Sequence, residues 1–293
     1  MAPWSAPDAR PVEQAVLRAT PPHPVVVRTE APPGAPLVSH PLTRFDIVDT
    51  ALDTIKAAPR AVLGATALFL VPTEVLSTYV RRDELDLSDL NDAITPSWVV
   101  AIVLRLLVLS FVTFAVAHLV WAWQRGEAPT ATEAAAAAVR RAPALIVAWV
   151  VVHLLEGVAA LLLLLPLLVV APLLFAAVPV IAIERSGALA SLGRSWRLGA
   201  RDLPLLVGGF LIIALVGLAL MTGLSGLTYI SDAVFDSFDI SGAWIVQAAV
   251  RLATWMIVVP FLAAACTLTY LDLRVRREGL DIELAVARHF GKR

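Results

Sequence analysis

The chain of 293 residues is 59% hydrophobic and only 16% charged, with a mean hydropathy of +0.80 and a formal net charge of −1. Soluble domains average about 45–50% apolar and about 25% charged residues, so this composition excludes an ordinary soluble domain and indicates a membrane protein. The single cysteine, Cys266, excludes an intramolecular disulfide and a cysteine-based metal cluster.

The N-terminal segment is rich in proline. Residues 1–41 hold ten of the chain's twenty prolines and contain no apolar core of the length that a signal peptide requires. We therefore expect residues 1–41 to form a disordered, partly polyproline tail on the cytoplasmic side. Residues 42–293 are expected to form one all-α membrane domain.

Six segments are apolar enough to cross a membrane, for which a helix needs about 20 residues. The apolar run from 143 to 183 is too long for one crossing at about 1.5 Å per residue, so we divide it at Pro166. The expected spans are about 61–80, 98–123, 144–165, 167–183, 205–222 and 244–271.

The basic residues indicate the orientation of these spans. Of the 23 Lys and Arg, 19 precede the first span, lie in the second or fourth connection, or follow the last span. The connections 81–97 and 231–242 are acidic instead. The positive-inside rule then predicts that both termini lie in the cytoplasm and that the basic helices face an anionic inner leaflet.

A short helical stretch, a basic residue and a proline precede each odd-numbered span, as in FDIVDTALDTIKAAPRAV, TATEAAAAAVRRAPALIV and LASLGRSWRLGARDLPLLV. Two even-numbered spans also resemble each other, because segments 97–107 and 243–253 both place an arginine seven residues after a tryptophan. These repeats favour three helix–span–span units. The short helices are amphipathic and are expected in the cytoplasmic interface.

Two of these short helices carry polar faces of opposite sign. Asp46, Asp49 and Asp53 share one face of the first, whereas an arginine stripe follows the third at Arg194, Arg197 and Arg201. A basic stripe suits an anionic leaflet, but an aspartate stripe does not. One hypothesis is that the aspartates contact arginines of the third helix or of the C-terminal tail, and the alternative is that all three face water.

Four ionisable residues lie deep in expected spans: Glu74, Arg105, Glu156 and Arg251. At about 1.5 Å per residue, all four fall in one layer in the outer half of the membrane. A charge there costs about 2.5–3.5 kcal/mol, so such groups pair or face water. The set is read either as a structural clamp or as a polar site for a headgroup, an ion or a proton. His118 and His153 are read as satisfied or interfacial histidines.

The last span ends in a charged segment, Leu268–Leu284. Its arginines anchor the exit from the inner leaflet and form i,i+4 pairs with acids, and Gly279 suits a helix end before a last helix over 282–289. Anchoring requires only bases, so we expect the acids to tie the tail to the helix at 194–201. The candidate interface residues are Asp272, Arg274, Arg276, Arg277 and Glu278.

Three stretches, PLTRFDIVDTALDTIKAAPRAV, PVIAIERSGALASLGRSWRLGARDLPLLVG and TLTYLDLRVRREGLDIEL, carry a family resemblance. They resemble the membrane domain associated with bacterial glycerophosphodiester phosphodiesterases and its stand-alone actinobacterial relatives of unknown function. The resemblance implies a multi-pass helical domain in the cytoplasmic (inner) cell membrane, linked to lipid or envelope metabolism. The phosphodiesterase activity belongs to a separate barrel domain, for which this chain has no room. The matching residues are Pro41, Asp46, Asp49, Pro59, Arg60, Glu184, Gly187, Leu192, Arg194, Ser195, Trp196, Leu198, Tyr270, Asp272, Arg274, Arg276, Arg277, Glu278, Gly279 and Asp281.

The sequence contains no P-loop, dinucleotide-binding glycine fingerprint, zinc-protease helix or nucleophile elbow. We therefore expect a non-enzymatic membrane protein without cofactor, metal or nucleic-acid partner. It would act as a scaffold or accessory factor in envelope or lipid processes, with a membrane or cytoplasmic protein partner. The alternative is a small transporter or lipid-handling protein that uses the Glu/Arg layer. A cavity of several hundred Å³ at that layer would favour the alternative.

Overall fold

The computed structural model describes residues 31–80, 95–162, 166–238 and 243–290, and these residues form helices without any strand. Six apolar helical segments are long enough to cross a membrane, which confirms the expected all-α, multi-pass fold. They are α3 (Pro59–Val80), α4 (Pro96–Gln124), α6 (Ala142–Leu161), the pair α7 (Leu167–Leu174) and α8 (Ala177–Glu184), α10 (Leu203–Phe238) and α11 (Ala243–Glu278).

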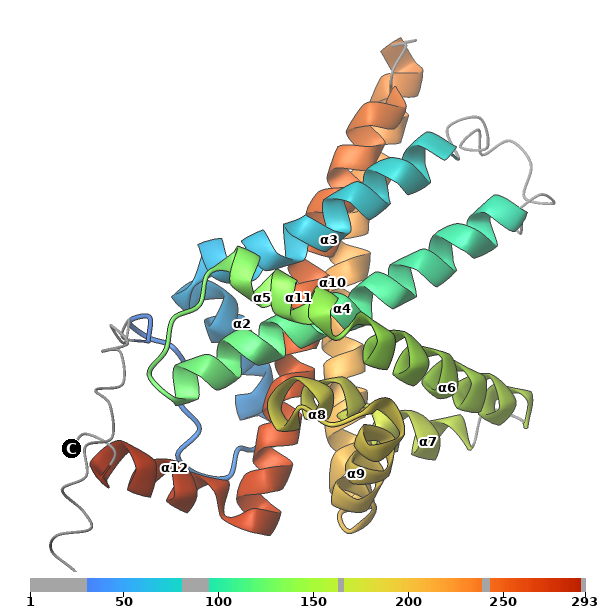
Figure 1. The fold of residues 1–293 in the computed structure, drawn as a ribbon. Coiled ribbons are helices and arrows are strands. Elements are labelled where there is room, and N and C mark those ends of the chain that lie inside the picture. Colours follow the sequence, from blue (N-terminus) through green and yellow to red (C-terminus); the bar gives the residue numbers. More distant parts are fainter. Residues whose placement is uncertain (1–30, 81–94, 163–165, 239–242, 291–293) are drawn as a thin grey trace, which may run out of the picture.

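Three short helices precede the odd-numbered spans: α2 (Arg44–Ala57), α5 (Ala131–Arg140) and α9 (Ala188–Ala200). The order of one short helix and two long spans therefore occurs three times along the chain (Figure 1). Helix α2 packs on α11, α5 packs on α3 and α4, and α9 packs on α7 and α8. A last helix, α12 (Leu280–Phe290), extends away from the end of α11 (Figure 1).

Two of the short helices begin at capping boxes. The Thr43 hydroxyl accepts a hydrogen bond from the Asp46 amide at 3.2 Å, and the Asp46 carboxylate accepts one from the Thr43 amide at 2.8 Å. Thr130 and Glu133 make the same reciprocal bonds at 3.3 and 2.7 Å. Both boxes satisfy amides that the first turn of a helix leaves without partners, so the helices start at these threonines.

The core is centred on α11, which packs against α10, α4, α2 and α3. Its C-terminal half contributes the fully buried Phe261, Leu268 and Tyr270. Helices α10 and α11 run side by side along the molecule, whereas α6 and α7 form a hairpin at its periphery (Figure 1). Gly279 ends α11 with φ +66°, a conformation in which a residue without Cβ is not strained.

The boundary expected at residue 41 is wrong, because the last part of the proline-rich segment is packed into the core. Val38 is 2% exposed, and its amide donates to the Gln124 side-chain oxygen at 3.0 Å. The Gln124 side-chain nitrogen donates to the Pro36 carbonyl at 2.9 Å. A buried glutamine that pairs both its polar atoms with backbone holds this segment in place. Residues 1–30 of the expected tail lie outside the described residues.

The fourth span, expected as one helix over 167–183, is broken at Phe175–Ala176. Pro179 has no amide hydrogen, so the Phe175 carbonyl loses the partner it would have in a continuous helix. The Cys266 thiol of α11 donates to that carbonyl at 2.8 Å. The Ser195 hydroxyl of α9 donates to the Leu173 carbonyl at 2.6 Å. Both bonds come from other helices, which shows how the break is stabilised inside the protein.

Candidate functional site

One ion pair joins the first two spans inside the apolar region. The Arg105 guanidinium of α4 contacts the Glu74 carboxylate of α3 through two hydrogen bonds, of 2.6 and 2.9 Å. The Glu74 side chain is 4% exposed and that of Arg105 is 22% exposed. The guanidinium also lies 5.0 Å from the ring centroid of Trp255 on α11. This bidentate geometry links three helices and neutralises both charges.

A cavity of about 540 Å³ lies beside this pair, between α4, α6, α7, α8, α10 and α11. Its walls are mainly apolar, and pockets for small molecules are typically about 300–1,000 Å³ in volume with a few polar groups among apolar ones. Leu218 and Met221 of α10 line it and remain 60% and 38% exposed, so the cavity opens to the outside of the helix bundle. The break between α7 and α8 also lies on its wall, at Phe175.

Helix α6 contributes the polar part of the cavity wall. Trp149, His153 and Glu156 all line the cavity, and their spacing of four and three residues places them on one helix face. The Trp149 and His153 rings lie 4.7 Å apart, and Nδ1 of His153 is 2.9 Å from the Trp149 carbonyl. The Trp149 indole nitrogen is buried without a hydrogen-bond partner in the described part of the chain. Glu156 is half-buried.

The structure brings together two of the four charges that the sequence placed in one layer. Glu74 and Arg105 form the pair described above. Within the described residues, Glu156 has no ion pair or hydrogen bond to a base, and it lines the cavity instead. Arg251 lies on α11, half-buried and one turn before Trp255, outside the cavity lining. A single four-residue cluster therefore does not form: Glu74 and Arg105 pair with each other, and Glu156 borders a cavity.

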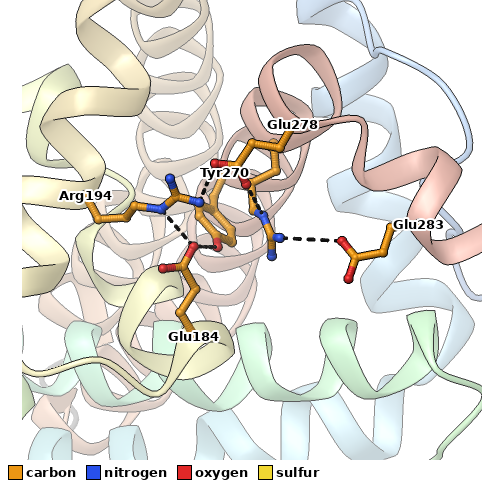
Figure 2. Close-up of polar contacts among 6 residues, drawn as sticks. Glu184, Arg194, Tyr270, Glu278 and Glu283 are labelled. Atoms are coloured by element: carbon orange, nitrogen blue, oxygen red, sulfur yellow. Dashed lines mark hydrogen bonds and ion pairs between the residues drawn. The ribbon is translucent and has the colours of Figure 1, made fainter.

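On the other side of the molecule, charged residues of four helices form a connected network (Figure 2). Arg194 of α9 contacts Glu184 at 2.9 Å and Glu278 at 2.5 Å. The Tyr270 hydroxyl donates to the same Glu184 oxygen at 2.8 Å. Arg274 contacts Glu278 at 2.9 Å and Glu283 of α12 at 3.9 Å.

This network confirms the expected contact between the charged tail and the 194–201 helix, through Glu278 and Arg194. Burial disfavours the charged form of Arg194, but its hydrogen bonds to Glu184 and Glu278 outweigh burial and raise the pKa of the guanidinium above its ordinary value. The arginine is therefore held charged at the junction of α8, α9 and α11.

Asp272 does not contact the 194–201 helix as expected; it binds the N-terminal segment instead. It accepts a hydrogen bond from the Leu42 amide at 2.8 Å, and Arg276 donates to the Leu42 carbonyl at 2.5 Å. Asp272 and Arg276 also pair with each other at 2.8 Å. Arg277 contacts Asp202, at the start of α10, rather than Asp281. The side chains of Asp272 and Arg276 thus bind both backbone polar groups of Leu42.

The aspartate face of α2 makes only local contacts and none with arginine in the described residues. Asp46 is the capping residue of α2, and hydrogen bonds from the Thr43 backbone and side chain lower the pKa of its carboxyl. Asp53 pairs locally with Lys56, and Asp49 is exposed. In the described residues, none of the three acids pairs with an arginine, so the docking hypothesis for this face is wrong. The remaining arginines of the expected stripe, Arg197 and Arg201, are exposed.

Three functional features were missed from the sequence. Gln124 contacts Val38 and Asp202 contacts Arg277, and no local sequence pattern predicts either long-range contact. The polar face of α6 had a visible signal, because Trp149, His153 and Glu156 recur at helical spacing in an otherwise apolar span. Among the described residues, no group of three or more His, Cys, Asp or Glu could hold a metal ion. Comparison with protein-family models, curated proteins and solved structures found no match to this chain.

Proposed function

We propose that this chain is a non-enzymatic, lipid-handling protein that binds a single amphiphilic molecule in its intramembrane cavity. The observation that carries the proposal is the cavity of about 540 Å³, whose walls are mainly apolar and whose acid and histidine both lie on one face of α6. Apolar walls suit a hydrocarbon chain, and the polar face suits a headgroup. The resemblance to the membrane domain associated with glycerophosphodiester phosphodiesterases supports a lipid-related role.

The opening of the cavity supports access from the lipid phase. Leu215 and Leu218 of α10 and Leu154 of α6 are between 60% and 65% exposed, and they are large apolar side chains that a bilayer would cover. An amphiphile could then move sideways from the hydrocarbon into the cavity without crossing water. The broken span at Phe175 adjoins the cavity, as discontinuous helices adjoin the binding sites of many transporters.

Photo-crosslinking tests this proposal. A neutral monoacylglycerol with a diazirine on its chain is added to the protein in phosphatidylcholine nanodiscs, and crosslinked peptides are mapped by mass spectrometry. We expect saturable labelling on α6 and α10. Ala214→Trp, which fills the cavity, should abolish it, whereas Ala219→Trp, an exposed residue of α10 outside the lining, should not. Equal labelling of all lipid-facing helices, unaffected by Ala214→Trp, would contradict the proposal.

The proposed orientation places α2, α5, α9 and α12 on the cytoplasmic side of the inner membrane, with both termini in the cytoplasm. The distribution of basic residues supports it. On α9 the exposed Trp196, Arg197 and Arg201 suit an anionic leaflet. Reporter fusions after residue 293 and within 81–94 test the orientation: activity of a cytoplasmic reporter at the first site only is expected, and the reverse pattern would refute it.

Scaffolding is a second candidate function, favoured by α12. Ile282 and Val286 are 66% and 51% exposed on one face, whereas Leu280 and Leu284 are buried on the other. An exposed apolar stripe on a terminal helix suits a protein partner. A photo-reactive residue at position 286 in native membranes should crosslink one partner reproducibly. Labelling of lipid alone would refute scaffolding through this helix.

A further inference from the structure

The lining of the cavity carries an acidic side chain without a matching Arg or Lys. Glu156 is the only acid among the described lining residues, and none of them is Arg or Lys. The nearby Arg105 is neutralised by Glu74 outside the lining. A carboxylate in an apolar region is costly unless an opposite charge accompanies it. No Arg or Lys in the described part of the chain pairs with Glu156, so a ligand with a positive charge would complete the pair.

The histidine beside it adds a second hydrogen-bonding group to this face of α6. Because a carbonyl oxygen only accepts, the 2.9 Å contact from Nδ1 of His153 to the Trp149 carbonyl assigns the ring proton to Nδ1. In the neutral ring Nε2 is then an acceptor. The polar face of α6 therefore offers a carboxylate and an imidazole acceptor, which suit a group that donates hydrogen bonds or carries positive charge.

Aromatic rings from three other parts of the bundle complete this environment. Besides Trp149, the lining includes Phe175, Phe210 and Trp255. Phe175 and Phe210 meet edge to face, with centroids 5.4 Å apart. Trp255 already has a guanidinium 5.0 Å from its ring centroid, on Arg105. Faces of aromatic rings attract cations, most strongly once the cation has left water.

From these observations we infer that the cavity binds a lipophilic monovalent cation, an amphiphile with an amine or quaternary ammonium group placed against Glu156 and His153. This inference rests on the proposed function and names its ligand class. The apolar part of the ligand lies against α10 and α11. An anionic headgroup would instead meet Glu156 with no Arg or Lys in the described lining to compensate.

Two probes of matched shape and opposite charge test the inference: tetraphenylphosphonium and tetraphenylborate. Binding of each is measured by equilibrium dialysis against the protein in phosphatidylcholine nanodiscs, with empty nanodiscs subtracted. We expect one saturable tetraphenylphosphonium site per chain and no saturable tetraphenylborate site. Glu156→Gln should weaken tetraphenylphosphonium binding at least about tenfold, whereas Glu156→Asp, which keeps the charge, should weaken it less.

The neutral photo-crosslinking probe separates this inference from the proposed function. Its saturable labelling of α6 and α10 in the unmodified protein tests the cavity by itself, and an unchanged midpoint of unfolding in sodium dodecyl sulfate shows that Glu156→Gln is folded. Equal binding of the two ions, or no effect of Glu156→Gln on the cation, while neutral labelling persists, would overturn the cation inference alone. Absence of both cation binding and site-specific neutral labelling would overturn the proposed function with it.

Discussion

Replacing Arg105 with methionine should destabilise the protein more than replacing Glu74 with glutamine. The two side chains form a bidentate pair, but their surroundings differ: the Glu74 side chain is 4% exposed, whereas that of Arg105 is 22% exposed and lies over Trp255. Without arginine, Glu74 keeps no partner in an apolar region. Without the carboxylate, Arg105 keeps the tryptophan ring, some solvent and the amide oxygen of the new glutamine.

The magnitude of the Arg105→Met effect has two bounds. Breaking a buried ion pair by removing one partner costs about 3–5 kcal/mol. The Arg105 side chain is 22% exposed, so the pair is not fully buried and the loss should fall at the lower end of that range. We therefore expect a loss of about 3 kcal/mol for Arg105→Met and about 1–2 kcal/mol for Glu74→Gln, whose remaining arginine is better compensated. The double variant should lose less than Arg105→Met alone.

Unfolding by sodium dodecyl sulfate from mixed micelles, followed by tryptophan fluorescence, gives the four free energies of this double-mutant cycle. The expected coupling between Glu74 and Arg105 is about 2 kcal/mol. Losses below about 0.5 kcal/mol for both single variants would refute the role of the pair as a clamp, because that is the range of ordinary surface substitutions. Additive losses in the double variant would also refute it.

Three further outcomes are expected. Asp272→Ala should lower the free energy of unfolding by about 1–3 kcal/mol, because the Leu42 amide and the Arg276 guanidinium lose their partner. The matched variant Asp49→Ala, at an exposed position, should change it by less than about 0.5 kcal/mol. Equal effects of the two variants in a denaturant titration would contradict this. Hydrogen bonds from the backbone and side chain of Thr130 lower the pKa of Glu133 in the folded protein. The stabilisation that Glu133 contributes is therefore complete above its unfolded-state pKa of about 4.3, and it is lost as the pH falls through the folded-state pKa. Melting temperatures between pH 3 and 7 should show a shallower acid decline for Glu133→Gln, and an unchanged slope would count against this account. Ser195→Ala should cost about 1–3 kcal/mol by leaving the Leu173 carbonyl without its side-chain donor, and an unchanged melting temperature would mean that water or backbone replaces it.

The helical spans and the short helices between them were predictable because their signals are local. Apolar length identified the six spans, and the Thr43 and Thr130 capping boxes lie within four residues of the helix starts they determine. The end of α11 at Gly279 was predictable for the same reason, because glycine alone adopts a positive φ without strain. The last helix begins two residues earlier than expected, at Leu280, directly after this glycine.

The charge pairing was only partly predictable. Asp272–Arg276 and Arg274–Glu278 are i,i+4 pairs, and helix geometry alone brings them together. Contacts between different helices followed the sequence less closely. Arg194–Glu278 forms as expected, but the aspartates of α2 face water. Charge sign shows which residues could attract each other, and it says nothing about which helix faces are apposed.

The sequence by itself therefore determined most of the helices and the membrane character of the chain, since hydropathy, capping and helical periodicity act over a few neighbouring residues. Only the tertiary structure decided which charges are neutralised and where the cavity lies. The Leu42 amide meets Asp272 across 230 residues of sequence, and Glu156 borders a space formed by five other helices. Such relations depend on how whole helices pack, and packing is a property of all their side chains together.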